Sequence, residues 1–144
     1  MNCILDTNIV SLAMAGDDTV VGHLTRLEPG MAAISAVTYA EIRYGLRRMA
    51  SAPLSKARQQ ELADREVVFE RLLDHVDVLA WDADAAAAYA DERVGCERDG
   101  EALSLADLMI LAHACSTGRV LVTRDSALQR RGRKGPHRTE VISW

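Results

Sequence analysis

Four acidic side chains stand in sequence contexts that favour a shared site: Asp6, Glu41, Asp107 and Asp125. Asp6 directly follows the apolar run CIL, and Asp125 follows RVLVTR at 119–124. Four carboxylates gathered in one place would repel one another unless a divalent cation neutralised them. Ligand sets made only of oxygen suit the hard ions Mg²⁺ and Mn²⁺. The four acids therefore predict a site for one or two such ions.

Each acid also has a simpler interpretation when it is considered alone. Asp6 and Asp125 can cap the helices that follow them, a contact worth about 1 kcal/mol. Glu41 can be an ordinary exposed helix residue, and Asp107 can complement the dipole of a helix from its first turn. All four interpretations must hold independently if the acids share no site, so the joint arrangement favours one cluster.

Helical positions support the cluster. On the helix predicted over 37–50, at about 100° per residue, Glu41 borders the apolar stripe of Tyr39, Ile42, Leu46 and Met49. On the helix predicted over 104–118, Asp107 shares its face with Leu103, Ile110, Leu111 and Ala114. A carboxylate on such a face pays a desolvation penalty unless a cation meets it.

Short apolar runs alternate with helical patterns along the chain, which predicts an α/β fold. Strands are predicted over 2–5, 31–35, 76–81, 119–123 and 139–144. Helices are predicted over 7–15, 18–28, 37–50, 55–75, 82–100 and 104–118, with a helical turn at 125–131. This order favours one domain over 1–144, with a mostly parallel sheet of about five strands and helices on both faces. The carboxyl ends of parallel strands meet at one edge, where sites form.

Composition excludes several other classes of protein. The net charge of −4 and the pI of about 5.5 disfavour a broad basic surface, and 4% aromatic residues disfavour a base-stacking platform. The three cysteines show no CxxC spacing, so neither a disulfide framework nor a zinc knuckle is indicated, and a cytoplasmic location is expected. No membrane span is expected. His113 lies about 240° around its helix from Asp107 and His137 lies in a basic segment, so neither is expected to bind the metal.

Four blocks of the sequence resemble the signature blocks of PIN-domain ribonucleases, most closely the VapC-type toxins of bacterial type II toxin–antitoxin pairs. The blocks are LDTNI at 5–9, AEIRYGL at 40–46, ADLMILAHA at 106–114 and VLVTRD at 120–125. The resemblance spans the chain from Ile4 to Trp144. It implies a three-layer α/β/α fold, a Mg²⁺- or Mn²⁺-dependent endoribonuclease activity, a homodimer and neutralisation by a cognate antitoxin.

The resemblance also implies roles for individual residues. It places Asp6, Glu41, Asp107 and Asp125 in the catalytic metal site, with Thr7, Asn8 and Thr123 as polar support. The fourth acid is the one most often replaced in relatives, which makes Asp125 the least constrained ligand. The chain departs from the family at Leu128, where relatives often carry an aromatic residue, and in the basic segment RRGRKGPHR at 130–138.

Basic residues outside the acidic site are expected to contact the phosphates that flank the cleaved bond of RNA. The candidates are Arg43, Arg47, Arg48, Arg124, Arg131, Arg133 and Lys134. For the segment 130–138, a solvated loop tip without a ligand is an equally good interpretation.

Two other functions remain open at this stage. The first is a phosphatase that uses Asp6 as its nucleophile, as haloacid-dehalogenase-like enzymes do, but those enzymes carry a second Asp two residues later, where this chain has Asn8. The second is a non-catalytic scaffold that keeps the fold and binds a protein partner. Retention of all four acids counts against the scaffold.

Overall fold

The sheet in the computed structural model, which describes all residues 1–144, has five strands that are all parallel. The strands are β1 (Cys3–Leu5), β2 (Ala32–Ser35), β3 (Asp77–Leu79), β4 (Val120–Val122) and β5 (Val141–Ile142). Their spatial order is β3-β2-β1-β4-β5. The predicted five-stranded sheet is therefore confirmed. The two edge strands are much shorter than predicted, since each has a ladder partner on one side only.

Seven helices connect and cover the strands. They are α1 (Thr7–Met14), α2 (Asp18–Leu24), α3 (Ala36–Ala50), α4 (Lys56–Leu73), α5 (Ala83–Asp99), α6 (Leu105–Thr117) and α7 (Ser126–Lys134). Six of them occupy the helical regions expected from sequence. The seventh, α7, continues past the helical turn predicted at 125–131 and takes in part of the basic segment 130–138.

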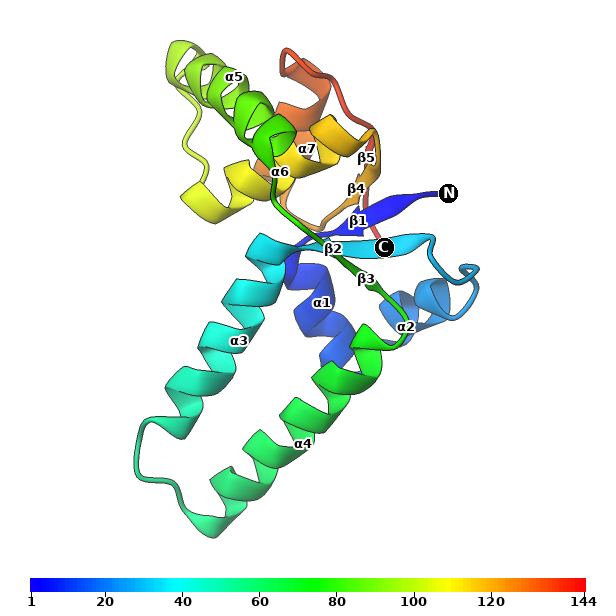
Figure 1. The fold of residues 1–144 in the computed structure, drawn as a ribbon, viewed down its shortest axis with the longest axis vertical. Coiled ribbons are helices and arrows are strands. Elements are labelled where there is room, and N and C mark those ends of the chain that lie inside the picture. The colour runs from blue at the N-terminus through cyan, green and yellow to red at the C-terminus, as the bar shows by residue number, and fades with distance from the viewer.

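The helices form two layers with the sheet between them, as predicted. Helices α5, α6 and α7 lie on one side of the sheet, and α1 to α4 lie on the other, where α3 and α4 form a long hairpin (Figure 1). Successive side chains of β1 enter opposite cores because side chains alternate along a strand. Cys3 and Leu5 pack with Ile9 and Phe69, whereas Ile4 packs with Leu111 and its neighbours.

The order in which strands are added to the sheet reverses at strand β1. The chain passes from β1 to β2 on one side, and later returns to place β4 on the other side of β1. A parallel sheet opens a crevice at the carboxyl ends of two such strands, and ligands bind there in open α/β folds. Asp6 follows β1 and Thr123 follows β4, so both lie at this crevice.

None of the helices combines the length and the apolar character that crossing a membrane would require.

Candidate active site

Asp6 is the most deeply buried of the four acids, with 2% of its surface exposed. It caps α1, and its Oδ1 accepts a hydrogen bond of 2.7 Å from the Thr7 amide. Its Oδ2 accepts a second hydrogen bond, also 2.7 Å, from the hydroxyl of the buried Thr123. Both oxygens are thus held, one by the start of α1 and the other by the end of β4.

The electrostatic environment of Asp6 disfavours its charge. Burial raises the pKa of the Asp6 carboxyl to about 6, and the negative charges of Asp107 and Asp125 push it in the same direction. The hydrogen bonds from Thr123 and Thr7 act against this rise. Since Asp107 and Asp125 both affect the Asp6 pKa, these three carboxylates belong to one electrostatic unit.

Asp125 and Asp107 both lie at helix N-termini. Asp125 caps α7 through a hydrogen bond of 2.9 Å from the Leu128 amide, and its own amide donates to the Thr123 hydroxyl at 2.9 Å. Asp107 lies in the first turn of α6, where its Oδ2 accepts from the Ser104 hydroxyl at 2.6 Å. The capping and dipole interpretations are therefore correct as descriptions of local geometry, and they coexist with the electrostatic grouping.

Glu41 reaches the same region from α3. The Thr7 hydroxyl donates a short hydrogen bond to its Oε2, and that hydroxyl also lies 3.4 Å from the hydroxyl of the buried Thr38. Glu41 is half-buried, in agreement with its predicted border position. Because Thr7 directly follows Asp6, this contact joins Glu41 to the start of α1.

No cation compensates these charges. None of the ten ion pairs in the structure includes Asp6, Glu41, Asp107 or Asp125. The acids are also not arranged as a ready-made centre, since no group of three or more His, Cys, Asp or Glu side chains could hold a metal ion. Each of the other three acids instead accepts a hydrogen bond: Glu41 from the Thr7 hydroxyl, Asp107 from the Ser104 hydroxyl and Asp125 from the Leu128 amide.

The residue types nevertheless fit a hard cation. All four acids offer oxygen donors, and Oδ1 of Asn8 is the only buried side-chain oxygen or nitrogen that lacks a hydrogen-bond partner. Asn8 lies in the first turn of α1, two residues after Asp6. Buried polar groups without partners are rare and mark places where an ion or water belongs. Side-chain rotation at Glu41, Asp107 and Asp125 would be required to ligate an ion jointly.

A groove between α1 and α3 opens toward solvent beside Glu41. Its lining includes Thr7, Ser11, Glu41, Gly45, Met49 and Arg65. Thr7 and Glu41 make one part of this groove polar, and Met49 contributes to its apolar part. The groove therefore gives Glu41 access to a molecule outside the protein.

Comparison with known proteins decides the family. A family model described as the PIN domain matches residues 3–134. The chain belongs to the PIN-domain family. The resemblance found in the sequence blocks is thereby confirmed.

Curated relatives of this PIN domain are VapC proteins. It is 32% identical over 123 residues to the tRNA(fMet)-specific endonuclease VapC of Shigella flexneri, which covers 85% of this chain and 86% of the relative. It is 33% identical over 135 residues to a VapC ribonuclease of Sinorhizobium fredii, which covers 86% of this chain and 87% of the relative.

Solved structures agree with this assignment. The DNA-bound VapBC of Salmonella typhimurium matches with a TM-score of 0.79 at 25% identity, over 100% of this chain and 98% of that chain. VapBC2 of Rickettsia felis, bound to a promoter DNA fragment, matches with a TM-score of 0.80 at 24% identity, over 100% and 99%. The three-layer α/β/α PIN fold with an all-parallel sheet is thus confirmed.

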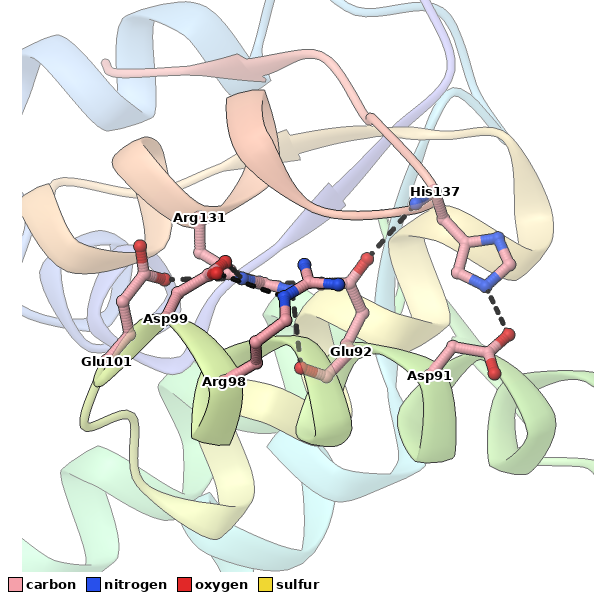
Figure 2. Close-up of polar contacts among 7 residues, drawn as sticks. All are labelled: Asp91, Glu92, Arg98, Asp99, Glu101, Arg131 and His137. Carbon is pink, nitrogen blue, oxygen red and sulfur yellow. Dashed lines mark hydrogen bonds and ion pairs between the residues drawn. The ribbon is translucent and has the colours of Figure 1, made fainter.

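The structure of this PIN domain corrects the prediction for Arg131. Its side chain is 0% exposed and pairs with Glu92, Asp99 and Glu101, so it cannot contact an RNA phosphate (Figure 2). The interpretation of 130–138 as a solvated loop is also wrong in its first half, which belongs to α7. Sequence charge alone does not separate a buried guanidinium from an exposed one.

The other predicted RNA contacts divide into two groups. Arg43 pairs with Glu70, and Arg124 pairs with Asp17 and donates to the Trp144 carbonyl, so these cations already have partners. The remaining four are exposed and form no ion pair: Arg47, Arg48, Arg133 and Lys134.

Neither histidine considered from sequence lies with the acids. His113 is buried, and its Nδ1 lies 2.8 Å from the Ser35 hydroxyl. Burial lowers the pKa of His113, which favours the neutral ring. His137 pairs with Asp91 on α5.

Two residues that contact one of the four acids or its hydrogen-bond partner were not identified from sequence. Ser104 caps α6 and donates to Asp107, and the pattern S-x-x-D before an apolar run is the signal that predicts this cap. Thr38 is buried beside Thr7, and no local pattern distinguishes it from any other Thr in a helix.

Proposed function

We propose that this chain is a Mg²⁺- or Mn²⁺-dependent endoribonuclease that acts as the toxin of a toxin–antitoxin pair. The observation that supports this most strongly is the uncompensated charge at the crevice between β1 and β4. Asp6 is buried, the negative charges of Asp107 and Asp125 raise its pKa, no cationic side chain pairs with any of the three, and Oδ1 of Asn8 has no hydrogen-bond partner. A structural cluster would be costly to keep in this form, whereas a metal site requires it.

In this mechanism Asp6, Glu41, Asp107 and Asp125 hold one or two divalent ions, with Asn8 as a further oxygen donor. When bound, such an ion lowers the pKa of a water and offsets negative charge at the phosphate that is cleaved. Thr123 holds Asp6 and the Asp125 backbone together, and Thr7 connects Glu41 to the start of α1. These hydroxyls orient the carboxylates.

RNA would be held by basic residues near the site. Arg47 and Arg48 lie near the end of α3, the helix that carries Glu41, and they have no acidic partner. Arg133 and Lys134 lie at the end of α7, the helix that Asp125 caps. The relative from Shigella flexneri is named for cleavage of tRNA(fMet), which makes a tRNA the first substrate to test.

An antitoxin partner is supported by structural neighbours such as the VapBC complex of Salmonella typhimurium and a member of the VapBC family of toxin–antitoxin systems from Mycobacterium tuberculosis. We also propose that residues 1–144 form one domain, because both hydrophobic clusters pack on one sheet. A homodimer and a cytoplasmic location complete the proposal.

The test is cleavage of defined RNAs, including tRNA, by the purified chain after any bound partner has been removed. Wild type should cleave with Mg²⁺ or Mn²⁺ and be inert with EDTA, and Asp6→Asn should be inert throughout. Equal inactivity of wild type and Asp6→Asn with both ions would favour the non-catalytic scaffold. A covalent phosphate trapped on Asp6 would instead support the phosphatase.

Expression of the chain alone should stop bacterial growth, and coexpression of its antitoxin should restore it. Asp6→Asn provides the matched control, because it removes one negative charge and keeps the size of the side chain. Growth arrest by Asp6→Asn equal to that by wild type would separate toxicity from the proposed chemistry.

A further inference from the structure

Arg131 is the largest fully buried side chain in the protein, and it lies in a network with three carboxylates that we call the Arg131 network. Its Nε donates to Glu92 Oε2 at 2.8 Å, and its Nη1 lies 2.9 Å from Asp99 Oδ2 and 3.6 Å from Glu101 Oε2. Figure 2 shows the guanidinium placed among these carboxylates. Glu92 is 1% exposed, so its pair with Arg131 is withdrawn from solvent.

The surroundings hold this pair in one arrangement. The Glu92 carbonyl accepts from Arg131 Nη2 at 3.4 Å, and Glu92 Oε1 accepts from the His137 amide at 3.3 Å. Two glycines leave room for the groups: a Cβ at Gly95 would lie 2.0 Å from Arg131 Nη2, and a Cβ at Gly135 would lie 2.5 Å from Glu92 Oε2. A side chain at either glycine would therefore displace a member of the ion pair.

Folding alone does not require an ion pair at this place. A buried Arg–Glu pair loses much of its attraction to desolvation, and apolar residues of similar volume often give equal or greater stability. Unlike apolar contacts, the ion pair is directional, because the planar guanidinium donates hydrogen bonds to a carboxylate only along its N–H bonds. A fixed orientation of α7 is therefore the property to explain.

The Arg131 network is connected along the chain to two acids of the proposed metal site, one on each side of the network. Arg131 lies on α7, and the cap of that helix, Asp125, is six residues earlier, or about 9 Å along the axis. On the other side, Asp99 and Glu101 lead directly to Ser104, which caps α6 and holds Asp107. The network thus joins α7, which Asp125 caps, to the segment 99–101 that leads into α6, the helix that carries Asp107.

We propose that Arg131 and Glu92 are positioning residues that set the separation of the Asp107 and Asp125 carboxylates. The proposal rests on the metal-dependent function proposed above. Groups that orient metal ligands from outside typically affect metal affinity by about 10- to 100-fold when they are removed. The Arg131 network would act in this way through two helices, without touching the ion or the RNA.

The experiment compares two double variants, each of which replaces one Arg and one Glu by Met. One variant changes α7 and α5, and the other changes α5 alone. In Arg131→Met/Glu92→Met, both charges of the buried pair are replaced by apolar side chains of similar length, so that neither charge is left alone. The matched control is Arg93→Met/Glu97→Met, which removes an exposed Arg–Glu pair from α5. Thermal unfolding reports whether each variant is as stable as wild type.

Two measurements then test positioning. Titration with Mn²⁺ in the absence of RNA should show affinity at least about tenfold weaker for the buried-pair variant and unchanged for the control. Crystal structures of both double variants should show a changed Asp107–Asp125 separation only where the buried pair is removed. Arg131→Lys, which keeps the charge but loses the planar fork, should give an intermediate Mn²⁺ affinity.

The outcomes separate this proposal from the proposed function. A folded buried-pair variant with the wild-type carboxylate separation overturns the positioning role, whatever the metal does. Wild type that neither binds Mn²⁺ nor cleaves RNA overturns the metal-dependent function, and a changed separation in the variant would then still support positioning of the acids. Wild-type Mn²⁺ affinity despite a changed separation also overturns the proposal.

Discussion

The Thr123 hydroxyl donates a hydrogen bond to Asp6 Oδ2 at 2.7 Å and accepts one from the Asp125 amide at 2.9 Å. One buried side chain thus connects the acid that follows β1 to the acid that follows β4. A hydroxyl group can donate one hydrogen bond and accept up to two, so Thr123 uses its only donor on Asp6. The contact places Thr123 at the centre of the proposed site.

Replacing Thr123 by Val, which has nearly the same shape, should weaken Mn²⁺ binding. The substitution removes a hydrogen bond that favours the charged form of Asp6, so the pKa of Asp6 should rise further above 6. Calorimetric titration with Mn²⁺ at pH 7 measures the effect. Thr123→Ser keeps the hydroxyl and should retain most of the affinity; equal loss in both variants would contradict this role.

The stability of the metal-free protein should depend on pH through Asp6. Its folded-state pKa lies above the ordinary value of 3.8, so the folded protein holds this proton more tightly than the unfolded chain does. The protonated Asp6 therefore stabilises the folded state in full below pH 3.8, and this contribution is lost as the pH rises toward 6. A shift of this size corresponds to about 3 kcal/mol.

The variant Asp6→Asn measures the contribution of Asp6 to the pH dependence of the unfolding free energy, because Asn does not titrate. Urea unfolding in EDTA should find the variant more stable than wild type at pH 7.5, by up to about 3 kcal/mol, and close to wild type at pH 4. A difference in unfolding free energy that stays constant between the two pH values would show that burial does not penalise the Asp6 charge.

Divalent ions should offset most of that difference. Mn²⁺ at about one hundred times its dissociation constant should stabilise wild type by about 2.7 kcal/mol, since it binds only the folded state. Asp6→Asn and Glu41→Gln should gain much less. The rise in the unfolding midpoint with Mn²⁺ concentration gives the measurement, with K⁺ at matched ionic strength as the control.

Removal of Arg47 and Arg48 should weaken RNA binding in a salt-dependent way. If each contacts one phosphate of single-stranded RNA, Arg47→Ala/Arg48→Ala should reduce the slope of log affinity against log salt by about 1.4. Filter binding in Ca²⁺ over a range of KCl concentrations measures that slope. Arg26→Ala/Arg93→Ala removes the same charge elsewhere, and an equal change in both double variants would indicate a general charge effect.

Much of the fold could be predicted because the strands of this sheet are short apolar runs separated by clear helical patterns. Asp6 and Asp125 could be placed at one edge since both directly follow such runs, and the parallel arrangement brings those ends together. The helical period placed Asp107 on the same face of α6 as the buried Ile110, Leu111 and Ala114, and in the structure its own side chain is half-buried. These inferences use only local sequence and one topological rule.

The position of Arg131 could not be predicted by the same means. Its partner Glu92 lies 39 residues earlier, on a helix whose pairing with α7 is a tertiary contact. The segment RRGRKGPHR has the composition of a solvated loop. Only when the helix is known to continue past residue 131 does its period place Arg131 and Gly132, three and four residues after the buried Leu128, on the inner face. Other local signs of close packing are Gly95, Gly132 and Gly135, which become informative once the tertiary contacts of these helices are known.

The acids of the proposed site come from four separate parts of the chain, and the central strand is made first. During synthesis, β1 and Asp6 leave the ribosome long before β4, α6 and α7 exist. β1 therefore cannot pair with β4 until more than a hundred further residues have been added. Any catalytic centre that depends on Asp6, Asp107 and Asp125 together is therefore absent from a nascent chain. Such an enzyme would become able to cleave RNA only after the segment that carries Asp125 has been synthesised.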